Sequence, residues 1–213
     1  MELNKYIDHT ALKSAVTEKE IETLCNEAKK YNFKSVCVNP CDVSLAVKCL
    51  SGTDVKVCTV IGFPLGKNAT EVKVFETEKA LKDGATEFDM VINVAKLKEG
   101  NALFVENEIK AVINSAKGNV CKVIIETGLL TDEEIALATK ITCRAGADFV
   151  KTCTGFTGGV ATENAVKILM ANLSGKTLIK ASGGIRTKKD ALNFISLGVS
   201  RIGTSAGVKI MEE

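Results

Sequence analysis

Two lysines that each end a short apolar run carry the clearest chemical potential in this sequence. Lys151 follows the apolar pair at 149–150 and leads into Thr-Cys-Thr-Gly, while Lys180 follows the pair at 178–179 and leads into Ala-Ser-Gly-Gly. Near-continuous apolar runs are typical of strands in a parallel sheet that is covered on both faces. Because lysine is seldom buried without a reason, these two positions predict amine chemistry on a carbonyl group.

A lysine amine becomes a nucleophile only after it loses its proton, and its ordinary pKa is about 10.4. Bringing this pKa near 7 requires about 4–5 kcal/mol of destabilisation of the ammonium form. A second ammonium about 6 Å away supplies about 3 kcal/mol at an effective dielectric constant of about 20, and burial can supply the rest. Lys151 is therefore the candidate nucleophile, with Lys180 as its neighbour. The alternative is that the two lysines act independently, by binding phosphate or by extending outwards.

Asp89 is the candidate carboxylate of the same site. Side chains alternate along a strand, so positions 87, 89, 91 and 93 of the segment Glu-Phe-Asp-Met-Val-Ile-Asn share one face. The apolar residues between them fit a layer that faces helices, which directs Asp89 towards the interior of the sheet. A carboxylate there can shuttle protons and balance the lysine charges. A purely structural salt bridge to one lysine is the alternative.

Two glycine-containing segments predict a phosphate-binding site. Gly-Gly-Ile-Arg at 183–186 and Gly-Thr-Ser at 203–205 each follow an apolar run. Barrel enzymes often bind phosphate in the loops after their seventh and eighth strands, where backbone N–H groups and a helix N-terminus meet the anion. Ordinary turn glycines are the alternative reading of the same residues.

The elements that must position these residues alternate along the whole chain. Amphipathic helical stretches separate the apolar runs, and two of them begin with capping-box pairs, Thr17 with Glu20 and Thr131 with Glu134. The candidate strands cover residues 5–9, 35–39, 55–61, 87–93, 121–126, 148–152, 177–181 and 201–204. Strands that alternate with helices predict right-handed βαβ units and a parallel sheet.

Eight such strands predict an α/β protein with a (β/α)8 (TIM) barrel, formed as one domain over residues 1–213. An open doubly wound sheet is the alternative, but no G-x-G-x-x-G follows the first strand. Glycines and unusual polar residues gather directly after the predicted strands. This is the edge at which α/β barrels place their catalytic groups.

The composition and net charge of the chain limit the classes of partner that we expect it to bind. Hydrophobic residues make up 46% of the chain and the net charge is +2, so electrostatics predicts neither a nucleic-acid partner nor a membrane partner. The first ten residues lack the apolar segment of a signal peptide, and no run approaches the roughly 20 apolar residues of a membrane span. We therefore expect a cytoplasmic protein.

The eight cysteines contain no C-x-x-C pair, and His9 is the single histidine. This predicts no metal site and no disulfide framework, and we expect no cofactor. About six or seven of the cysteines are expected to be small core residues. Cys37 lies near the predicted catalytic edge, where it is either a reactive thiol close to the lysines or a core residue. For His9 we expect a buried, hydrogen-bonded role.

Together these segments closely resemble the deoxyribose-phosphate aldolase family of class I aldolases. The resemblance covers nearly the whole chain, in family order, through YIDHTALK, SVCVNP, VIGFPLG, EFDMVIN, VIIETGLL, FVKTCTG, IKASGGIR and RIGTSAG. It implies a barrel in which Lys151 forms the Schiff base, Lys180 is the second lysine and Asp89 is the acid of the proton relay.

The resemblance also implies a set of residues that contact a small phosphosugar, with no metal, and the chain is expected to form a homodimer. Asp8 and Thr10 would contact the sugar hydroxyls. The remaining predicted substrate-binding residues are Cys37, Thr154, Gly155, Ser182, Gly183, Gly184, Ile185, Arg186, Gly203, Thr204 and Ser205. Ser14 and Cys153 depart from the family pattern beside the site, and Phe156 stands where some members have lysine, so fewer cationic groups would hold the phosphate.

The implied reaction is the reversible cleavage of 2-deoxy-D-ribose 5-phosphate into acetaldehyde and D-glyceraldehyde 3-phosphate, in deoxyribose phosphate catabolism. Another Schiff-base aldolase that acts on a different phosphosugar is one alternative. A catalytically silent phosphosugar-binding protein is a second alternative, although binding alone needs no amine at the reacting carbon.

Overall fold

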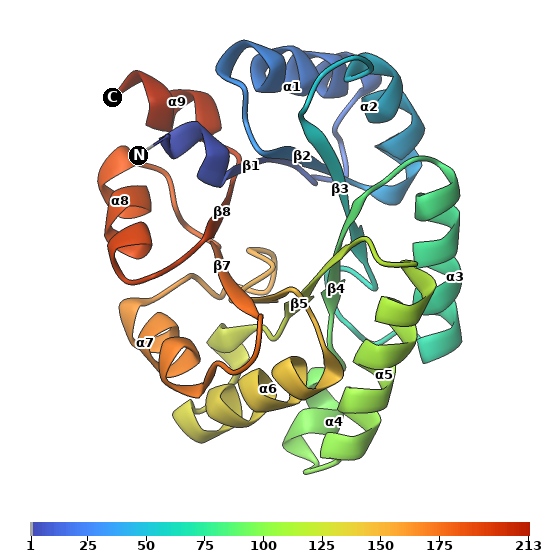
Figure 1. Ribbon diagram of the computed structural model, residues 1–213, viewed down its shortest axis with the longest axis vertical. Coiled ribbons are helices and arrows are strands. Elements are labelled where there is room, and N and C mark those ends of the chain that lie inside the picture. The colour runs from blue at the N-terminus through green and yellow to red at the C-terminus, as the bar shows by residue number, and fades with distance from the viewer. Residues whose placement is uncertain (1) are drawn as a thin grey trace.

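The computed structural model describes residues 2–213, and eight parallel strands in it close into a barrel surrounded by helices (Figure 1). The strands are β1 Ile7–Ala11, β2 Ser35–Val38, β3 Lys56–Ile61, β4 Glu87–Val91, β5 Val120–Ile124, β6 Phe149–Lys151, β7 Leu178–Ser182 and β8 Arg201–Thr204. Each strand pairs with the next along the chain, and β8 pairs with β1. The predicted (β/α)8 barrel is confirmed.

Helices connect the strands on the outside of the barrel (Figure 1). They are α1 Glu18–Tyr31, α2 Val43–Cys49, α3 Thr70–Lys82, α4 Val94–Lys98, α5 Ala102–Ser115, α6 Asp132–Ala145, α7 Glu163–Asn172, α8 Lys188–Ser196 and α9 Gly207–Glu212. Short 3-10 turns cover Leu3–Tyr6, Pro40–Asp42 and Thr127–Leu129. Both predicted capping boxes are present, and a third joins Thr187 to Asp190 at the start of α8. Each box satisfies backbone N–H groups that the first helical turn leaves free.

The apolar core lies between the barrel and its helices. Phe88 and Met90 of β4 are completely buried on the helix-facing side, and α1 buries Ile21 and Leu24 against the same layer. The inside of the barrel has the opposite character, because charged side chains fill much of it. The alternation predicted for 87–93 therefore holds within β4, with its acidic residues directed inwards.

Several strand boundaries differ from the sequence-based expectation. β1 begins at Ile7 because the residues before it form a 3-10 turn. β4 ends at Val91, which leaves the side chain of Asn93 to cap α4 by accepting the N–H of Lys96. β5 ends before Glu126, which has a left-handed backbone conformation with φ 57°. Each difference arises where a side chain or a turn takes over backbone hydrogen bonding from the sheet.

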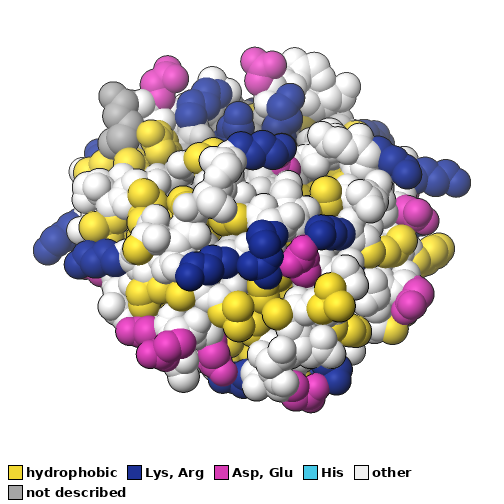
Figure 2. Space-filling model, turned by 60° about the horizontal axis from the view of Figure 1, so that its bottom comes forward, with side chains coloured by type: hydrophobic (Ala, Val, Ile, Leu, Met, Phe, Trp, Pro, Cys, Tyr) yellow, Lys and Arg dark blue, Asp and Glu magenta, His cyan; other side chains and the backbone are white. Residues whose placement is uncertain are grey.

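The surface is mixed in charge. On the face shown in Figure 2, Lys and Arg side chains extend across the upper and middle parts, while Asp and Glu lie mostly towards the edges. Five of the eight cysteines are buried, namely Cys25, Cys37, Cys58, Cys121 and Cys153, which is fewer than expected, and Cys41 is exposed. Within residues 2–213, no helix combines the length and apolar character needed to cross a membrane.

Candidate active site

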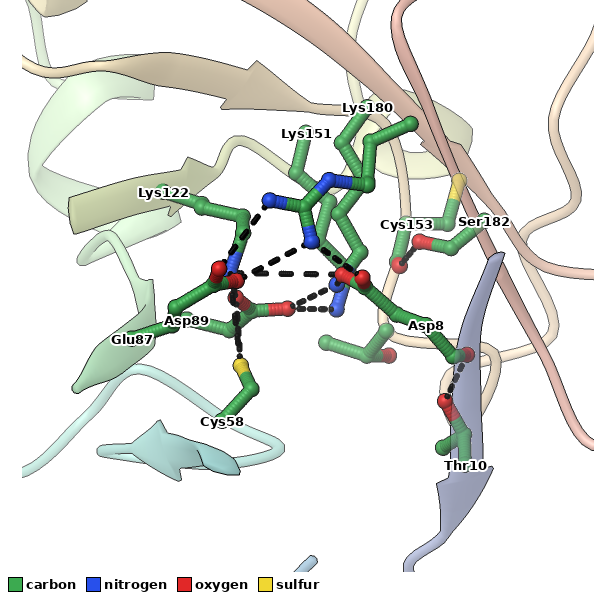
Figure 3. A network of polar contacts seen from close by, with 12 residues as sticks. Asp8, Thr10, Cys58, Glu87, Asp89, Lys122, Lys151, Cys153, Lys180 and Ser182 are labelled. Carbon is green, nitrogen blue, oxygen red and sulfur yellow. Dashed lines mark hydrogen bonds and ion pairs between the residues drawn. The ribbon is translucent and has the colours of Figure 1, made fainter. Parts of the chain in front are cut away.

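Charged side chains from six strands meet inside the barrel, and Figure 3 shows most of them. All are nearly or completely buried, and they comprise Asp8 of β1, Glu87 and Asp89 of β4, Lys122 of β5, Lys151 of β6, Lys180 of β7 and Arg201 of β8. The register brings several of them level with one another, since Lys151 pairs with Lys180 and Asp89 pairs with Lys122. We call these seven residues the barrel network.

Asp89 is the centre of the part of this network that contains Lys151 and Lys180. Its Oδ2 accepts hydrogen bonds from Lys151 Nζ and Lys180 Nζ, each at 2.7 Å, and its Oδ1 accepts one from Lys122 Nζ at 2.9 Å. Burial alone would raise the pKa of Asp89, but the three ammonium groups outweigh it and hold that pKa well below its ordinary value. Asp89 is therefore a carboxylate at neutral pH.

The two predicted lysines are neighbours, as their spacing suggested. Because both bind the same oxygen of Asp89, their nitrogens lie no further apart than twice 2.7 Å. Two ammonium groups this close repel each other, but the carboxylate of Asp89 lies between them and offsets part of that repulsion. Burial would lower the pKa of Lys180, yet Asp8 and Asp89 raise it above its ordinary value. Lys180 therefore keeps its proton.

Asp8 is buried below this pair. Its carboxylate accepts hydrogen bonds from Lys180, from a guanidinium nitrogen of Arg201 and from Ser35 Oγ, the last at 2.7 Å. Burial would raise the pKa of Asp8, but Lys180 and Arg201 lower it well below the ordinary value. The resemblance implied that Asp8 contacts a substrate hydroxyl. In this structure both of its oxygens are instead engaged by the network, and Asp8 is completely buried.

Glu87, Lys122 and Arg201 complete the network and were missed by the sequence analysis. Arg201 binds Glu87 through both terminal nitrogens at 3.1 Å, and Lys122 Nζ lies 2.7 Å from Glu87 Oε2. Signals in the sequence mark two of these three residues. Glu87 shares a strand face with Asp89, and Lys122 is a lone charge inside the apolar run after position 120.

The charges of the barrel network are unequal, with four cations against three carboxylates. Among the described residues, Lys151 contacts only the carboxylate of Asp89, whereas Lys122, Lys180 and Arg201 each contact at least two carboxylates. Lys151 is therefore the cation of the network with the fewest carboxylate partners, and the other three cations equal the carboxylates in number. The geometry thus distinguishes two lysines that the sequence presents alike.

Cys37 and Cys58 lie beside the network on paired positions of β2 and β3. Cys58 Sγ lies 3.1 Å from Asp89 Oδ1 and 3.3 Å from Lys122 Nζ. Burial raises the pKa of Cys58 well above its ordinary value, while a hydrogen bond with Cys58 lowers the pKa of Cys37. Cys37 is completely buried and packs with Leu12 and Cys58, so core packing describes its position.

The ligand atoms of Cys37, Cys58 and Asp89 all lie within 4.8 Å of one another. Sequence spacing did not foresee this cluster, because the sheet register creates it. Three ammonium groups already occupy the oxygens of Asp89, and they disfavour the approach of a cation. The donor set therefore fits the proton network better than a resident metal.

The predicted phosphate segment 183–186 follows β7, the predicted segment 203–205 begins within β8, and Gly155 lies in the loop after β6. Gly155, Gly183 and Gly184 all have positive φ values, 79°, 99° and 79°. A Cβ on Gly155 would lie 3.8 Å from the Cα of Gly183, so the two loops meet closely. Positive φ favours glycine at all three positions. The loops therefore present bare backbone at the predicted edge of the barrel.

Several of the predicted substrate-binding hydroxyls form hydrogen bonds with the backbone, either of these loops or of β1. Ser182 Oγ donates to Cys153 O at 2.6 Å, and Thr204 Oγ1 donates to Ile185 O at 2.7 Å. Thr10 Oγ1 donates to Asp8 O, and Thr154 Oγ1 accepts the N–H of Phe156. The remaining residues of the predicted set divide by position, with Ile185 buried, Gly203 packed against Lys180, and Arg186 and Ser205 exposed.

Glu126 is a further residue at this edge, one to which the sequence analysis assigned no role. Its buried carboxylate accepts the backbone N–H of Thr154, at 3.3 Å and 3.2 Å to its two oxygens, and this joins the loop after β5 to the loop after β6. No spacing rule marks this residue, because its left-handed backbone conformation directs the carboxylate.

A second buried ion pair lies outside the barrel, between α3 and α5. Lys73 Nζ donates to Glu108 Oε1 at 2.7 Å, to Val91 O at 2.8 Å and to Gly66 O at 2.9 Å, and both side chains are completely inaccessible. Glu108 also accepts the N–H of Asn93. The pair therefore connects the loop after β3 to the end of β4, the strand that carries Asp89.

Replacing Glu108 by Gln should lower the free energy of unfolding by about 3 kcal/mol, because it leaves a buried ammonium without its carboxylate. Chemical denaturation measures this change. Glu99→Gln, which removes an exposed pair with Lys96, is the matched control and should leave stability nearly unchanged. Equal effects of the two substitutions would show that the buried pair contributes no more to the free energy of unfolding than the exposed pair does.

Known proteins are similar to this chain in sequence over nearly its whole length. A family model described as "DeoC/LacD family aldolase" matches residues 3–211. A protein of Finegoldia magna named deoxyribose-phosphate aldolase is 53% identical over 212 residues, covering 100% of each chain. A protein of the same name from Thermoanaerobacter sp. is 55% identical over 216 residues, covering 100% of this chain and 97% of the relative.

Solved structures agree with the sequence comparison. A deoxyribose phosphate aldolase from Aeropyrum pernix, described as having a unique tetrameric structure, superposes with a TM-score of 0.89 at 36% identity. The match covers 99% of this chain and 89% of that one. Both the sequence and the fold of this chain are thus similar to those of proteins named deoxyribose-phosphate aldolase.

Proposed function

The chain belongs to the DeoC/LacD aldolase family and is an enzyme of the carbon–carbon lyase class, and from this premise we propose its reaction. The reaction is the reversible cleavage of 2-deoxy-D-ribose 5-phosphate into acetaldehyde and D-glyceraldehyde 3-phosphate, through a Schiff base on Lys151. Its setting is the cytoplasmic catabolism of deoxyribose phosphates. The unequal charge of the barrel network, in which Lys151 is the cation with a single carboxylate partner, is the observation that carries this assignment.

Cleavage begins when neutral Lys151 Nζ attacks C1 of the open-chain sugar. The resulting carbinolamine takes up one proton, loses water and becomes a cationic iminium. The iminium carries the same charge as the lysine ammonium, so the carboxylate of Asp89, 2.7 Å from Nζ, can stabilise it without any change in the network. This stabilisation favours the intermediate that must accept electrons in the next step.

The C3 hydroxyl then loses its proton and the C2–C3 bond breaks. The electron pair of that bond passes to the iminium nitrogen, which gives a neutral enamine in place of a high-energy carbanion. D-Glyceraldehyde 3-phosphate leaves at this stage. In the proposed relay, a water held by Asp89 and Lys180 receives the C3 proton. The pKa of Asp89 is held well below its ordinary value, so Asp89 favours passing this proton on over retaining it.

The second half of the reaction returns the enzyme to its starting state. A proton adds to C2 of the enamine and regenerates an iminium, which one water molecule hydrolyses to acetaldehyde, neutral Lys151 and one released proton. The neutral amine and the enamine leave the barrel network with three cations and three carboxylates. The ammonium and the iminium add one further positive charge. The cycle thus alternates between two charge states of the same network.

The direct test is to supply purified protein with 2-deoxy-D-ribose 5-phosphate and to measure both products. Acetaldehyde and D-glyceraldehyde 3-phosphate should form in equal amounts, and each should be needed for synthesis in the reverse direction. Cleavage of a different phosphosugar, with none of this one, would assign the site to another aldolase of the same fold. Binding of the sugar with no cleavage would indicate a silent binding protein.

The glycine loops are proposed to hold the phosphate group. Gly183 and Gly184 expose backbone beside Gly155, and α8 begins shortly after them. Backbone N–H groups at such a position bind phosphate through hydrogen bonds and the helix dipole. Ser205 is exposed just after β8 and can add a hydroxyl donor.

Replacing Ser205 by Ala should remove one charge-assisted hydrogen bond, worth about 1.5–3 kcal/mol. The kcat/KM for the phosphorylated sugar should therefore fall roughly 10–200-fold, with a much smaller change for unphosphorylated deoxyribose. Gly184→Val should act in the same direction, because its φ of 79° disfavours a side chain and its Cβ would lie 3.1 Å from Val160. Steady-state kinetics on both sugars measures the effect. Equal losses on the two would mean that these loops support the fold and do not bind phosphate.

We also propose that the chain forms a homo-oligomer, with the homodimer as the expected unit. Phe75 on α3 and Leu103 on α5 are 68% and 70% exposed on helices that pack together, and exposed apolar groups of this kind are typical of subunit contacts. The Aeropyrum pernix relative is described as tetrameric, so light scattering must distinguish two subunits from four.

A further inference from the structure

A cavity of about 650 Å³ lies at the end of the barrel opposite the predicted catalytic edge. Its lining contains the first residue of each strand from β3 to β8, which are Lys56, Glu87, Val120, Phe149, Leu178 and Arg201. Lys5 and Lys34, which precede β1 and β2, complete the ring. The cavity is therefore the N-terminal mouth of the barrel, and we use that name for it.

Positive charge is concentrated at the N-terminal mouth. Lys5, Lys34 and Lys56 line it, and within residues 2–213 none of their ammonium groups has an ion-pair or hydrogen-bond partner. The single carboxylate in the lining is Glu87, and Lys122 and Arg201 already bind it. A recess with low-dielectric walls strengthens the field of unpaired charges. The mouth therefore attracts anions although the whole chain has a net charge of only +2.

The inner wall of the mouth is built from ordered groups. Arg201 and Glu87 are almost completely buried and form its charged base. The guanidinium of Arg201 lies 5.5 Å from the centre of the Phe149 ring, and Leu178 is 45% exposed beside it. A ligand in the mouth would therefore meet apolar surface as well as the three lysines at the entrance.

We propose that the N-terminal mouth binds a small organic polyphosphate of nucleotide size, at a site separate from the catalytic one. The volume lies within the roughly 300–1,000 Å³ that small-molecule sites occupy, which favours a metabolite over a macromolecule. Three unpaired ammonium groups match a ligand with two or more phosphates. Phe149 and Leu178 offer an apolar wall to the organic part of the ligand.

The barrel network separates this site from the reacting lysine. Arg201, at the base of the mouth, binds Asp8, and Asp8 binds Lys180 on the catalytic side. The interior between the two ends is thus filled by side chains, so a ligand in the mouth cannot be the substrate of Lys151. Binding at the mouth can therefore be tested independently of the proposed aldol cleavage.

Isothermal titration calorimetry with ADP at low ionic strength tests the site. Wild-type protein should bind ADP, and affinity should fall as salt is added, because the contacts are exposed ion pairs. The double variant Lys34→Gln, Lys56→Gln should bind about tenfold more weakly. Lys19→Gln, Lys140→Gln removes the same charge from exposed lysines on α1 and α6 and should bind like wild type.

Two further results separate this site from the catalytic phosphate loops. Lys34→Gln, Lys56→Gln should retain the wild-type kcat/KM, which also shows that it folds, and Gly184→Val should retain the affinity for ADP. The proposal is overturned if wild-type protein does not bind ADP, or if the two double lysine variants weaken ADP binding equally. It is also overturned if Gly184→Val abolishes binding while the mouth variant does not, because ADP would then occupy the catalytic edge.

Discussion

Borohydride reduction in the presence of acetaldehyde is expected to leave an ethyl group on Lys151. Activity should fall in proportion to the fraction of Lys151 that is modified. Acetaldehyde condenses with the neutral amine to give an iminium, and hydride adds to its carbon, so the carbon–nitrogen bond can no longer hydrolyse. Lys151 should react first because it has one carboxylate partner, whereas Lys122 and Lys180 each have at least two. Peptide mass mapping at short reaction times identifies the modified lysine.

The control for this labelling is Lys151→Arg, which keeps a cation beside Asp89 but cannot form an iminium with acetaldehyde. This variant should show no rapid adduct and no measurable turnover, and its thermal unfolding should resemble that of wild type. A rapid adduct on Lys180, or continued turnover of fully reduced protein, would remove Lys151 from the proposed mechanism.

Replacing Lys180 by Leu should reduce turnover by about 10²–10⁴-fold, the usual contribution of a positioned proton-transfer group. The substitution should also change the pH dependence of turnover. Without Lys180 the network has three cations and three carboxylates, so a neutral amine at Lys151 would leave an excess negative charge. Catalysis needs the neutral amine, and the acid limb of the pH–rate profile should therefore move to higher pH.

Measuring kcat/KM across pH for wild type and Lys180→Leu tests this coupling. The variant should still fold, because its remaining cations and carboxylates are equal in number. Lys180→Arg, which preserves the charge, is the matched control and should leave the acid limb near its wild-type position even if turnover falls. An unshifted acid limb in Lys180→Leu would show that the two lysines do not influence each other through Asp89.

The sequence alone determined the alternation of strands and helices and the candidate residues at strand ends. These features are local, because a strand is marked by its apolar run and a helix start by its capping pair. Thr17 with Glu20 is such a pair, and the structure confirms it. Lys151, Lys180 and Asp89 were recognisable because a charge that interrupts a buried run conflicts with its surroundings. That conflict is visible within a few residues.

The tertiary structure decided which of these charges meet and how they share their partners. Asp8 and Arg201 are 193 positions apart, yet they bind each other because β8 pairs with β1 to close the barrel. The same closure adds Glu87 and Lys122, engages both oxygens of Asp8, and brings Lys151 and Lys180 onto one oxygen of Asp89. Sheet register is a long-range property, set when every strand has found its neighbours. The excess cation that singles out Lys151 therefore exists only in the closed barrel.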